Sequence, residues 1–328
     1  MHKNSLFIFR QDFRIHDNTG LIKAITASET VVPIFIFDTT ILAQFPAHDA
    51  RLTFILQALH ALDIQLKTIN SHLTIYHGDP KQIIPHLVEQ YSIDAIYRNE
   101  SYGHGAIHRD AWLQDRCRTH AVACDASHDY LLVPIDYTPA RKVFTPFYKL
   151  RQTYFEHNKP TVNHHTPTTQ TPKTEGLSRA QLENLLGVQV NRESAIDTST
   201  SHHSKQDQKN DHSKNHDANP RPVTLGTDRL AQFNFNTYDE TRNFPAVDGS
   251  SRLSPYTRFG LVSIREVYCK ALEQDAQVYI SELAWREFWQ HIYYNFSYSR
   301  DHEFQQKRRY IQRDNNEYFF EARKNGMT

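Results

Sequence analysis

The chain has 328 residues, which exceeds one typical compact unit and corresponds to about two domains. It contains 37 Lys and Arg residues and 37 Asp and Glu residues, so its formal net charge of zero excludes a strong overall attraction to nucleic acid or to an anionic membrane. Hydrophobic residues make up 39% of the chain and include 19 Phe and 17 Tyr, which is enough to build packed cores. Any site for a polyanion must therefore be a local patch.

The cysteines, Cys117, Cys124 and Cys269, form no C-x-x-C motif. An odd number without that motif argues against a disulfide framework and a closed thiolate zinc site, and it is typical of a reducing compartment. The N-terminal apolar run is too short for a signal peptide, and no segment has the length of a membrane span. We therefore expect a soluble, cytoplasmic protein with no membrane partner.

Residues 1–135 alternate short apolar runs, rich in β-branched and aromatic residues, with longer stretches of helical periodicity. This alternation predicts an open parallel sheet of the Rossmann-like α/β class, with helices over both faces. Leu52 to Leu62 and Ile83 to Val88 have the spacing of two such helices. The predicted strands are 6–9, 31–37, 73–79 and 95–99.

The next part of the chain is polar and contains several prolines and few apolar residues. This composition is typical of a linker, so we assign 136–222 to an interdomain linker that is largely disordered over 192–222. One short helix is predicted over 178–187. The histidines of this segment have no regular ligand spacing, which favours a solvated linker over a metal site.

Residues 223–328 have helical periodicity almost throughout, and we assign them to an all-α region. The clearest predicted helices cover 263–274, 277–296 and 317–325. About a hundred residues are few for an independent helical domain, so this region is expected to be incomplete.

A dense polar motif, Arg10 to Asn18, follows the first predicted strand. That position is the carboxyl edge of the sheet, where ligands bind in open α/β folds. A structural interpretation is equally open: Asp17 or Asn18 caps the next helix, and Arg14 pairs with Asp12. No glycine-rich phosphate loop of the P-loop or dinucleotide-binding type is present in the sequence.

A second motif contains Tyr238, Arg242 and the turn Gly249-Ser250-Ser251-Arg252-Leu253-Ser254. Backbone N–H groups and hydroxyls at the start of a helix suit a phosphate or pyrophosphate. The alternative is a helix cap made by Ser250 or Ser251 without any ligand.

A third motif lies in the predicted helix at 280–291. At helical spacing Glu282, Trp285, Arg286 and Trp289 share one stripe, opposite the apolar residues of the same helix. Aromatic rings beside charged groups suit stacking on a base and hydrogen bonding to its edge. The alternative is that the tryptophans belong to the core and that Glu282 and Arg286 form an i,i+4 ion pair.

Taken together and in this order, the motifs resemble those of the DNA photolyase and cryptochrome family, most of all a bacterial class I deoxyribodipyrimidine photolyase. Several long matches in one order make the resemblance specific, and it covers the chain except for the polar 157–222 stretch. The matching segments are Phe9–Asn18 for FRxDLRxxDN, Val143–Phe147 for VFTPF, Tyr238 with Arg242, Gly249–Ser254, and Glu282–Phe288 for ELxWREF.

The resemblance implies light-dependent repair of cyclobutane pyrimidine dimers in DNA, by electron transfer from excited, fully reduced FAD. On this basis 223–328 would be the first part of a helical FAD-binding domain, and we expect the protein to be a monomer. The residues implied to hold FAD are Tyr238, Ser250, Ser251, Arg252, Leu253, Ser254 and Tyr279.

The resemblance also implies contacts with damaged DNA. Glu282 would hydrogen-bond the flipped dimer and Trp285 would stack on it, so these two are the expected catalytic residues. Arg286 and Trp289 would line the same pocket, and Arg242 would reach a DNA phosphate. A base taken out of the stack requires such an aromatic platform and a polar group on its edge.

The sequence also departs from the family pattern. The helical domain of the family continues beyond the position of Thr328, so we expect a C-terminal truncation. Arg313 and Arg323 stand where tryptophans are common, and Gly105-Ala106 replaces a folate-binding Asn-Glu pair. A folate held differently, a deazaflavin or no antenna therefore remain open. The alternative function is a non-catalytic photolyase remnant or a cryptochrome-like protein that senses blue light or binds DNA.

Overall fold

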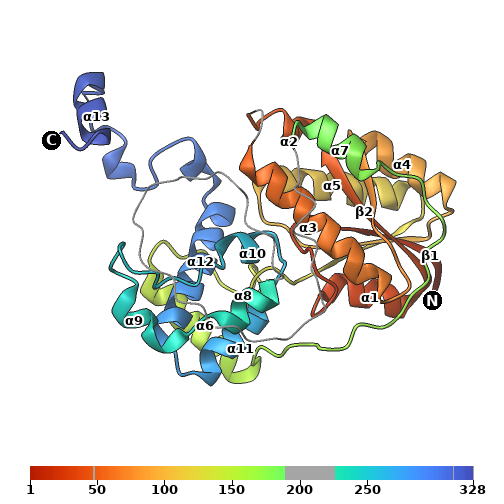
Figure 1. The fold of residues 1–328 in the computed structure, drawn as a ribbon, viewed down its shortest axis with the longest axis horizontal. Coiled ribbons are helices and arrows are strands. Elements are labelled where there is room, and N and C mark those ends of the chain that lie inside the picture. Colours follow the sequence, from red (N-terminus) through yellow and green to blue (C-terminus); the bar gives the residue numbers. More distant parts are fainter. Residues whose placement is uncertain (47–48, 189–225, 313, 328) are drawn as a thin grey trace, which may run out of the picture.

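The computed structural model describes residues 1–46, 49–188, 226–312 and 314–327 (Figure 1). Its N-terminal region is a five-stranded parallel sheet in the order β3-β2-β1-β4-β5, which confirms the predicted open α/β fold. In these described residues, no helix is both long and apolar enough to cross a bilayer. The strands are β1 His2–Ile8, β2 Ser28–Asp38, β3 Thr74–Gly78, β4 Ala95–Asn99 and β5 Ala123–Ser127.

Helices cover both faces of the sheet because the strands carry apolar residues on both sides. Alternation along β1 sends Leu6 to one face and Phe7 to the other. Helices α1 (Thr19–Ala27) and α3 (Ala50–Lys67) pack on the face of Phe7, whereas α4 (Pro80–Gln90) and α5 (His104–Thr119) pack on the face of Leu6. The remaining helix of this region is the short α2 (Thr39–Leu42).

The fifth strand was not predicted. Its sequence, ACDAS, lacks an apolar run because β5 is an edge strand, in which only Ser127 is buried. The inner strands β1, β2 and β4 are buried by neighbours on both sides, so their sequences carry the stronger signal.

The segment assigned to the linker, 136–222, contains helices α6 (Phe144–His157) and α7 (Arg179–Leu186). Ser178 caps α7 in a capping box, which accounts for the predicted helix at 178–187. Between the two helices the chain runs along the sheet, and Val31 N donates to Gln170 O at 3.1 Å. The predicted disorder at 192–222 lies outside the described residues, and the boundaries 1–135, 136–222 and 223–328 stay predictions.

The helices predicted at 263–274, 277–296 and 317–325 are confirmed as α11, α12 and α13. Val267 and Ala271 of α11 pack against Ile280 and Leu283 of α12 in the core of the helical region. The last helix projects away from the rest in Figure 1, and its Tyr318 is 74% exposed. From residue 226 onward the helices are α8 Gly226–Gln232, η2 Phe235–Thr237, α9 Tyr238–Thr241, α10 Ser254–Arg258, α11 Ile264–Glu273, α12 Gln277–Asn295, η3 Ser297–Arg300, η4 Gln306–Arg308 and α13 Glu317–Lys324.

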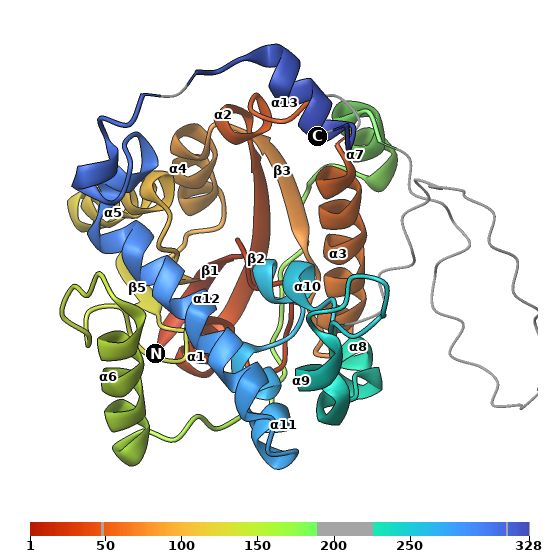
Figure 2. The ribbon, with the colours of Figure 1, turned by 90° about the vertical axis from the view of Figure 1, so that its left-hand side faces the viewer.

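Helix α12 is anchored to the rest of the molecule by a buried ion pair. Glu287 accepts a hydrogen bond from Arg151 Nε of α6 at 2.7 Å, and both side chains are at most 2% exposed. The same carboxylate accepts hydrogen bonds from the backbone N–H groups of Leu132 and Val133, which follow the sheet. In Figure 2, α12 crosses in front of the sheet.

Candidate functional site

The polar motif after β1 is buried and forms part of a joint. Arg14 donates to Asp129 at 2.6 Å, and these side chains are only 5% and 3% exposed. The expected pairing of Arg14 with Asp12 is therefore wrong. Asp12 accepts hydrogen bonds from Arg10 N at 2.7 Å and Asn99 Nδ2 at 2.6 Å instead. The expected helix cap is confirmed for Asn18, which is the N-cap of α1.

The same motif fastens the α/β region to the helical region. Arg265 of α11 reaches Asp17 at 2.7 Å and Asp129 at 2.8 Å. Burial by itself would raise the pKa of Asp129, but the guanidinium groups of Arg14 and Arg265 hold this pKa well below its ordinary value. Gly260 has φ +64° and lies against the backbone of the motif, where a Cβ would collide. The motif is thus an interdomain joint whose carboxylates are held by hydrogen bonds and ion pairs.

The second motif forms a turn that is partly buried in the helical core. The hydroxyls of Ser251 and Tyr279 share a hydrogen bond at 2.8 Å, and Leu253 packs in the core. Helix α10 begins at Ser254 and has Leu253 at its N-cap, without a side-chain capping bond. The alternative in which Ser250 or Ser251 caps this helix is therefore wrong.

The outer side of this turn is available to a ligand. Ser250 and Ser254 are exposed, and Arg252 has a left-handed backbone with φ 52°. Within the part of the chain that the structure describes, the N–H groups of Ser250, Ser251 and Arg252 have no hydrogen-bond acceptor. Successive free N–H groups around a left-handed residue form a concave anion site. The Arg252 side chain pairs with Asp248 at 2.7 Å on the surface.

An aromatic wall adjoins the turn. The ring of Tyr238 lies 4.9 Å from that of Tyr279, and the guanidinium of Arg242 lies 5.3 Å from the Tyr238 ring centre. Burial raises the pKa of Tyr279 to about 12, against the effect of its hydrogen bond with Ser251. The phenol therefore keeps its proton at neutral pH.

The charged residues of the third motif do not pair with each other. Glu282 accepts from Arg242 at 2.8 Å, which links the second motif to the third. Arg286 lies 4.1 Å from the ring centre of Tyr130 and donates to Tyr130 O at 3.1 Å. The alternative i,i+4 pair between Glu282 and Arg286 is therefore wrong.

The predicted stripe along α12 is confirmed. Trp289 is 58% exposed on the outer face, whereas Ile280, Ala284, Phe288 and Ile292 are buried on the inner face. The ring of Trp285 stacks on Phe144 of α6, with 3.7 Å between ring centres and 5° between planes. One face of Trp285 is therefore covered by an aromatic neighbour.

Contacts thus link the site residues expected from the sequence, from the 249–254 turn through Tyr238, Tyr279 and Glu282 to Trp289. Ser251, Leu253 and Tyr279 are buried beneath the others, which make up the candidate surface. Tyr130, Phe144 and Arg258 also lie at this surface and were not predicted from the sequence. Arg258 Nη1 donates to Tyr130 Oη at 3.4 Å. Although burial raises the pKa of Tyr130, Arg286 and Arg258 bring it below its ordinary value. Phe144 lies in the VFTPF segment, and this motif was the one sequence feature that could have identified it as a site residue.

The remaining positions singled out by sequence are separate from this surface. Gly105 and Ala106 lie in the first turn of α5, at the carboxyl edge of the sheet. Arg323 lies on the projecting helix α13. Arg313 lies outside the described residues.

Comparison with known proteins gives one consistent match. A family model described as DNA photolyase matches residues 5–169, half of the chain. The deoxyribodipyrimidine photo-lyase of a Synechococcus species is 28% identical over 310 residues, covering 89% of this chain and 60% of that protein. The corresponding enzyme of Halobacterium salinarum is 26% identical over 321 residues and is covered to 61%. The chain spans about 60% of the length of these relatives.

A solved structure extends the similarity to nearly the whole chain. The crystal structure of an archaeal photolyase from Sulfolobus tokodaii with two FAD molecules superposes with a TM-score of 0.74 at 26% identity. The superposition covers 99% of this chain and 67% of the archaeal one. The overall arrangement of the sheet and the helices is therefore shared.

Proposed function

Because this chain belongs to the DNA photolyase family, we propose that it acts in the light-dependent repair of cyclobutane pyrimidine dimers in DNA, as a deoxyribodipyrimidine photo-lyase that binds FAD. One observation carries the proposal: Arg242 and Glu282 join the anion-binding turn to the aromatic stripe of α12. A flavin nucleotide and a flipped base need such neighbouring sites, one for phosphates and one for a planar lesion.

The described residues fit part of a flavin nucleotide. The free N–H groups at Ser250 to Arg252 and the exposed hydroxyl of Ser254 would hold phosphate oxygens, while Tyr238 and Tyr279 would line one side. Leu253 would act by packing beneath the turn, because it is buried in the core. When bound in its reduced form and excited by light, FAD supplies the electron for dimer cleavage.

The residues of α12 would bind and orient the lesion. Trp285 offers a planar platform for a base that has left the stack, and Glu282 offers a carboxylate that accepts a hydrogen bond at the base edge. Arg286 and Trp289 would border the lesion, and Arg242 would contact a phosphate. A second chromophore, of folate or deazaflavin type, a cytoplasmic location and a monomeric state stay predictions.

One contact favours a second candidate function, a photolyase-type protein that binds flavin or DNA without repair. Phe144 covers one face of Trp285 at 3.7 Å, so only the other face is available for stacking on a lesion. A repair-competent protein must stack the lesion on that other face or move Phe144. The second candidate therefore differs from the first in the repair assay and not in flavin binding.

The first experiment is the visible absorption spectrum of the purified chain after incubation with FAD and desalting. We expect structured flavin bands with about one flavin per chain, followed by loss of dimers from an irradiated oligonucleotide under blue light. Flavin binding without repair would favour the second candidate. A colourless protein would contradict the flavin site in this chain.

A matched pair of glycine substitutions tests where the flavin binds. In Gly249→Ala the new Cβ would lie 2.3 Å from Thr241 Oγ1 and 2.9 Å from its carbonyl carbon, so the turn must shift. In Gly105→Ala the nearest atom is the flexible Arg109 side chain at 3.6 Å. We expect flavin retention to fall in the first variant and to stay at the wild-type level in the second. Equal retention in both would contradict the assignment of the turn.

A further inference from the structure

Two cysteines, Cys117 and Cys124, lie in the core on the face of the sheet that carries Leu6, away from the proposed flavin surface. Cys117 is in the last turns of α5 and is 4% exposed, and Cys124 is in β5 beside Ile96 of β4. Both pack in the same apolar core, and each thiol acts electrostatically on the other. The third cysteine, Cys269, is on α11, and its thiol donates to Pro160 O at 3.5 Å.

The two sulfur atoms have different electrostatic surroundings. Arg98 Nη1 donates to Cys124 Sγ at 3.1 Å from the neighbouring strand. The hydrogen bond from Cys117 and the charge of Arg98 lower the pKa of Cys124 to about 6, against burial and the carboxylate of Asp110. The same hydrogen bond, together with burial, raises the pKa of Cys117. The guanidinium beside Cys124 therefore favours a thiolate at Cys124 over one at Cys117.

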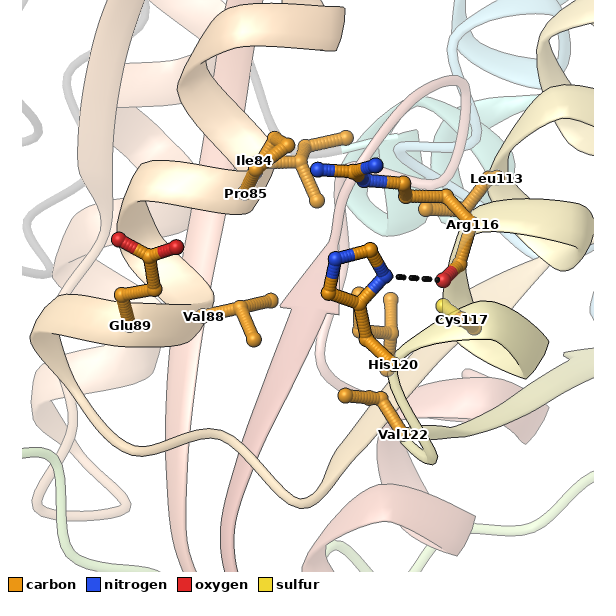
Figure 3. A pocket seen from close by; sticks show the side chains of 10 residues that line it. Ile84, Pro85, Val88, Glu89, Leu113, Arg116, Cys117, His120 and Val122 are labelled. Carbon is orange, nitrogen blue, oxygen red and sulfur yellow. Dashed lines mark hydrogen bonds between the residues drawn. The ribbon is translucent and has the colours of Figure 1, made fainter.

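A small cavity lies beside Cys117, and the side chain of Cys124 is partly exposed on the edge strand β5. The cavity has a volume of about 40 Å³ and is bordered by α4, α5, Ile96 of β4 and Val122. Figure 3 shows Cys117 at its wall, with Val88, His120 and Val122 around it. About 10–15 Å³ of such volume admits one water molecule, so the cavity admits a reagent of two or three non-hydrogen atoms, such as hydrogen peroxide.

We propose that Cys117 and Cys124 form a peroxide-sensitive dithiol that closes reversibly to a disulfide. The Cys124 thiolate attacks hydrogen peroxide, an S–O bond forms, the O–O bond breaks, and hydroxide leaves and takes up a proton to become water. The sulfur of Cys117 then attacks the resulting sulfenic acid, an S–S bond forms, and the hydroxyl leaves as water with the thiol proton. Two thiols are oxidised and one peroxide is reduced to two water molecules.

Formation of the disulfide would affect the charged residues at the carboxyl edge of the sheet through Arg98. Arg98 pairs with Asp110 at 3.2 Å, and Asp110 pairs with Arg10 at 2.5 Å in the motif after β1. A disulfide removes the negative sulfur that Arg98 contacts, so this guanidinium loses one of its partners. Oxidation thereby changes the charge balance at the edge where the α/β region meets the helical region.

The test is peroxide titration of the purified full chain, followed by blocking of free thiols, digestion and mass spectrometry. We expect a cross-linked peptide that contains Cys117 and Cys124 with the loss of two hydrogens, while Cys269 stays free. Reduction with a dithiol should reverse the cross-link. Oxidation of Cys269 before the pair, or a pair that stays reduced when Cys269 is oxidised, would overturn the proposal.

Single substitutions assign the steps, and Cys269→Ser is the matched control. Cys269→Ser should form the cross-link as the wild type does, and Cys124→Ser should not form it. Cys117→Ser should accumulate sulfenic acid at Cys124, which dimedone traps. Trapping at Cys117 in preference to Cys124 in the wild type would reverse the roles and contradict the proposal.

The thiolate is tested independently by the pH dependence of alkylation. In Cys117→Ser the hydroxyl still donates to Cys124, so the alkylation midpoint should stay near pH 6. In Cys117→Ala that donor is lost, so the midpoint should rise. At pH 7 we expect Cys124 of the wild type to react about tenfold faster than Cys269, because burial raises the pKa of Cys269 and keeps this thiol protonated there. Equal rates would contradict the role of Arg98.

Discussion

The segment after β1 and the outer stripe of α12 are both dense in charged residues, but the structure uses them differently. Asp12, Arg14 and Asp17 are buried, and Arg14 and Asp17 bind partners in both regions of the molecule. Glu282 and Arg286 are only half-buried, and Trp289 is exposed. A charged motif in a sequence therefore marks either a joint or a binding surface, and burial distinguishes the two.

This difference has an energetic reason. A buried charge without a partner is strongly destabilising, so the joint tolerates no loss of one member. An exposed ion pair contributes little to stability. Glu282 and Arg242 can therefore break their mutual contact and bind a ligand at a small cost in free energy. The joint fixes orientation, whereas the stripe remains free to bind.

The largest expected effect comes from breaking the joint. Asp129→Asn leaves the buried Arg14 without its charged partner and removes one of the two carboxylates that pair with Arg265, and should lower the free energy of unfolding by about 3–5 kcal/mol. The matched control is Asp248→Asn, which breaks the exposed pair with Arg252 and should cost less than about 1 kcal/mol. Urea denaturation measures both, and equal losses would remove the distinction between the regions.

The pH dependence of stability sharpens the comparison. Burial raises the pKa of Asp12 from 3.8 to about 6, so the folded protein holds this proton more tightly than the unfolded chain. Between about pH 4 and pH 6 this group should therefore lower stability as pH rises, by about 3 kcal/mol in total.

The measurement is the slope of unfolding free energy against pH in the wild type and in Asp12→Asn. The lowered pKa values of His128 and His291 act in the opposite direction, because the unfolded chain binds their protons more readily. They are present in both proteins, so the difference between the slopes isolates Asp12. Identical slopes would show that Asp12 does not titrate in this range.

A smaller effect is expected on the binding surface. Trp285→Ala should weaken the binding of dimer-containing DNA by about 1–3 kcal/mol, the contribution of one stacked base, with little change in flavin content. Trp285→Phe keeps a ring against Phe144 and should lose less. The measurement is a fluorescence anisotropy titration with damaged and undamaged duplexes. Unchanged affinity of the alanine variant for damaged DNA would rule out stacking on this residue.

The smallest effect on stability is expected for Arg242→Gln. Its ion pair with Glu282 is partly exposed, so the free energy of unfolding should change by less than about 1 kcal/mol. If Arg242 contacts a phosphate, DNA affinity should fall for all sequences, and the slope of log affinity against log salt should decrease by about 1. An unchanged salt dependence would remove Arg242 from the DNA contact.

Several elements were predictable from sequence, and others were not. The apolar inner strands and the long helices α3, α11 and α12 carry strong periodicity, because each buries one or both faces. Strand β5 and helices α5 and α6 were missed, because β5 is a polar edge and the helices have few fully buried residues. The surface of Tyr238, Glu282 and Trp285 was found through motifs of a known family.

The wrong predictions concerned the ion-pair partners of the charged residues. Arg14 binds Asp129 and not Asp12, and Glu282 binds Arg242 and not Arg286. In both cases the sequence offered a nearby opposite charge, and the fold supplied a more distant one. Phe144 and Tyr130 entered the site in the same way, from segments far from α12 in the chain.

The sequence by itself determined the classes of the two regions, the strands of the inner sheet and the outward stripe of α12. These follow from local periodicity, since a residue's position along a helix or strand fixes the face on which it lies. Only the tertiary structure decided which charges pair, which motif became a joint and which sulfur lies beside Arg98. Those contacts join residues that are distant in the chain, and their energies depend on burial, which no local pattern contains.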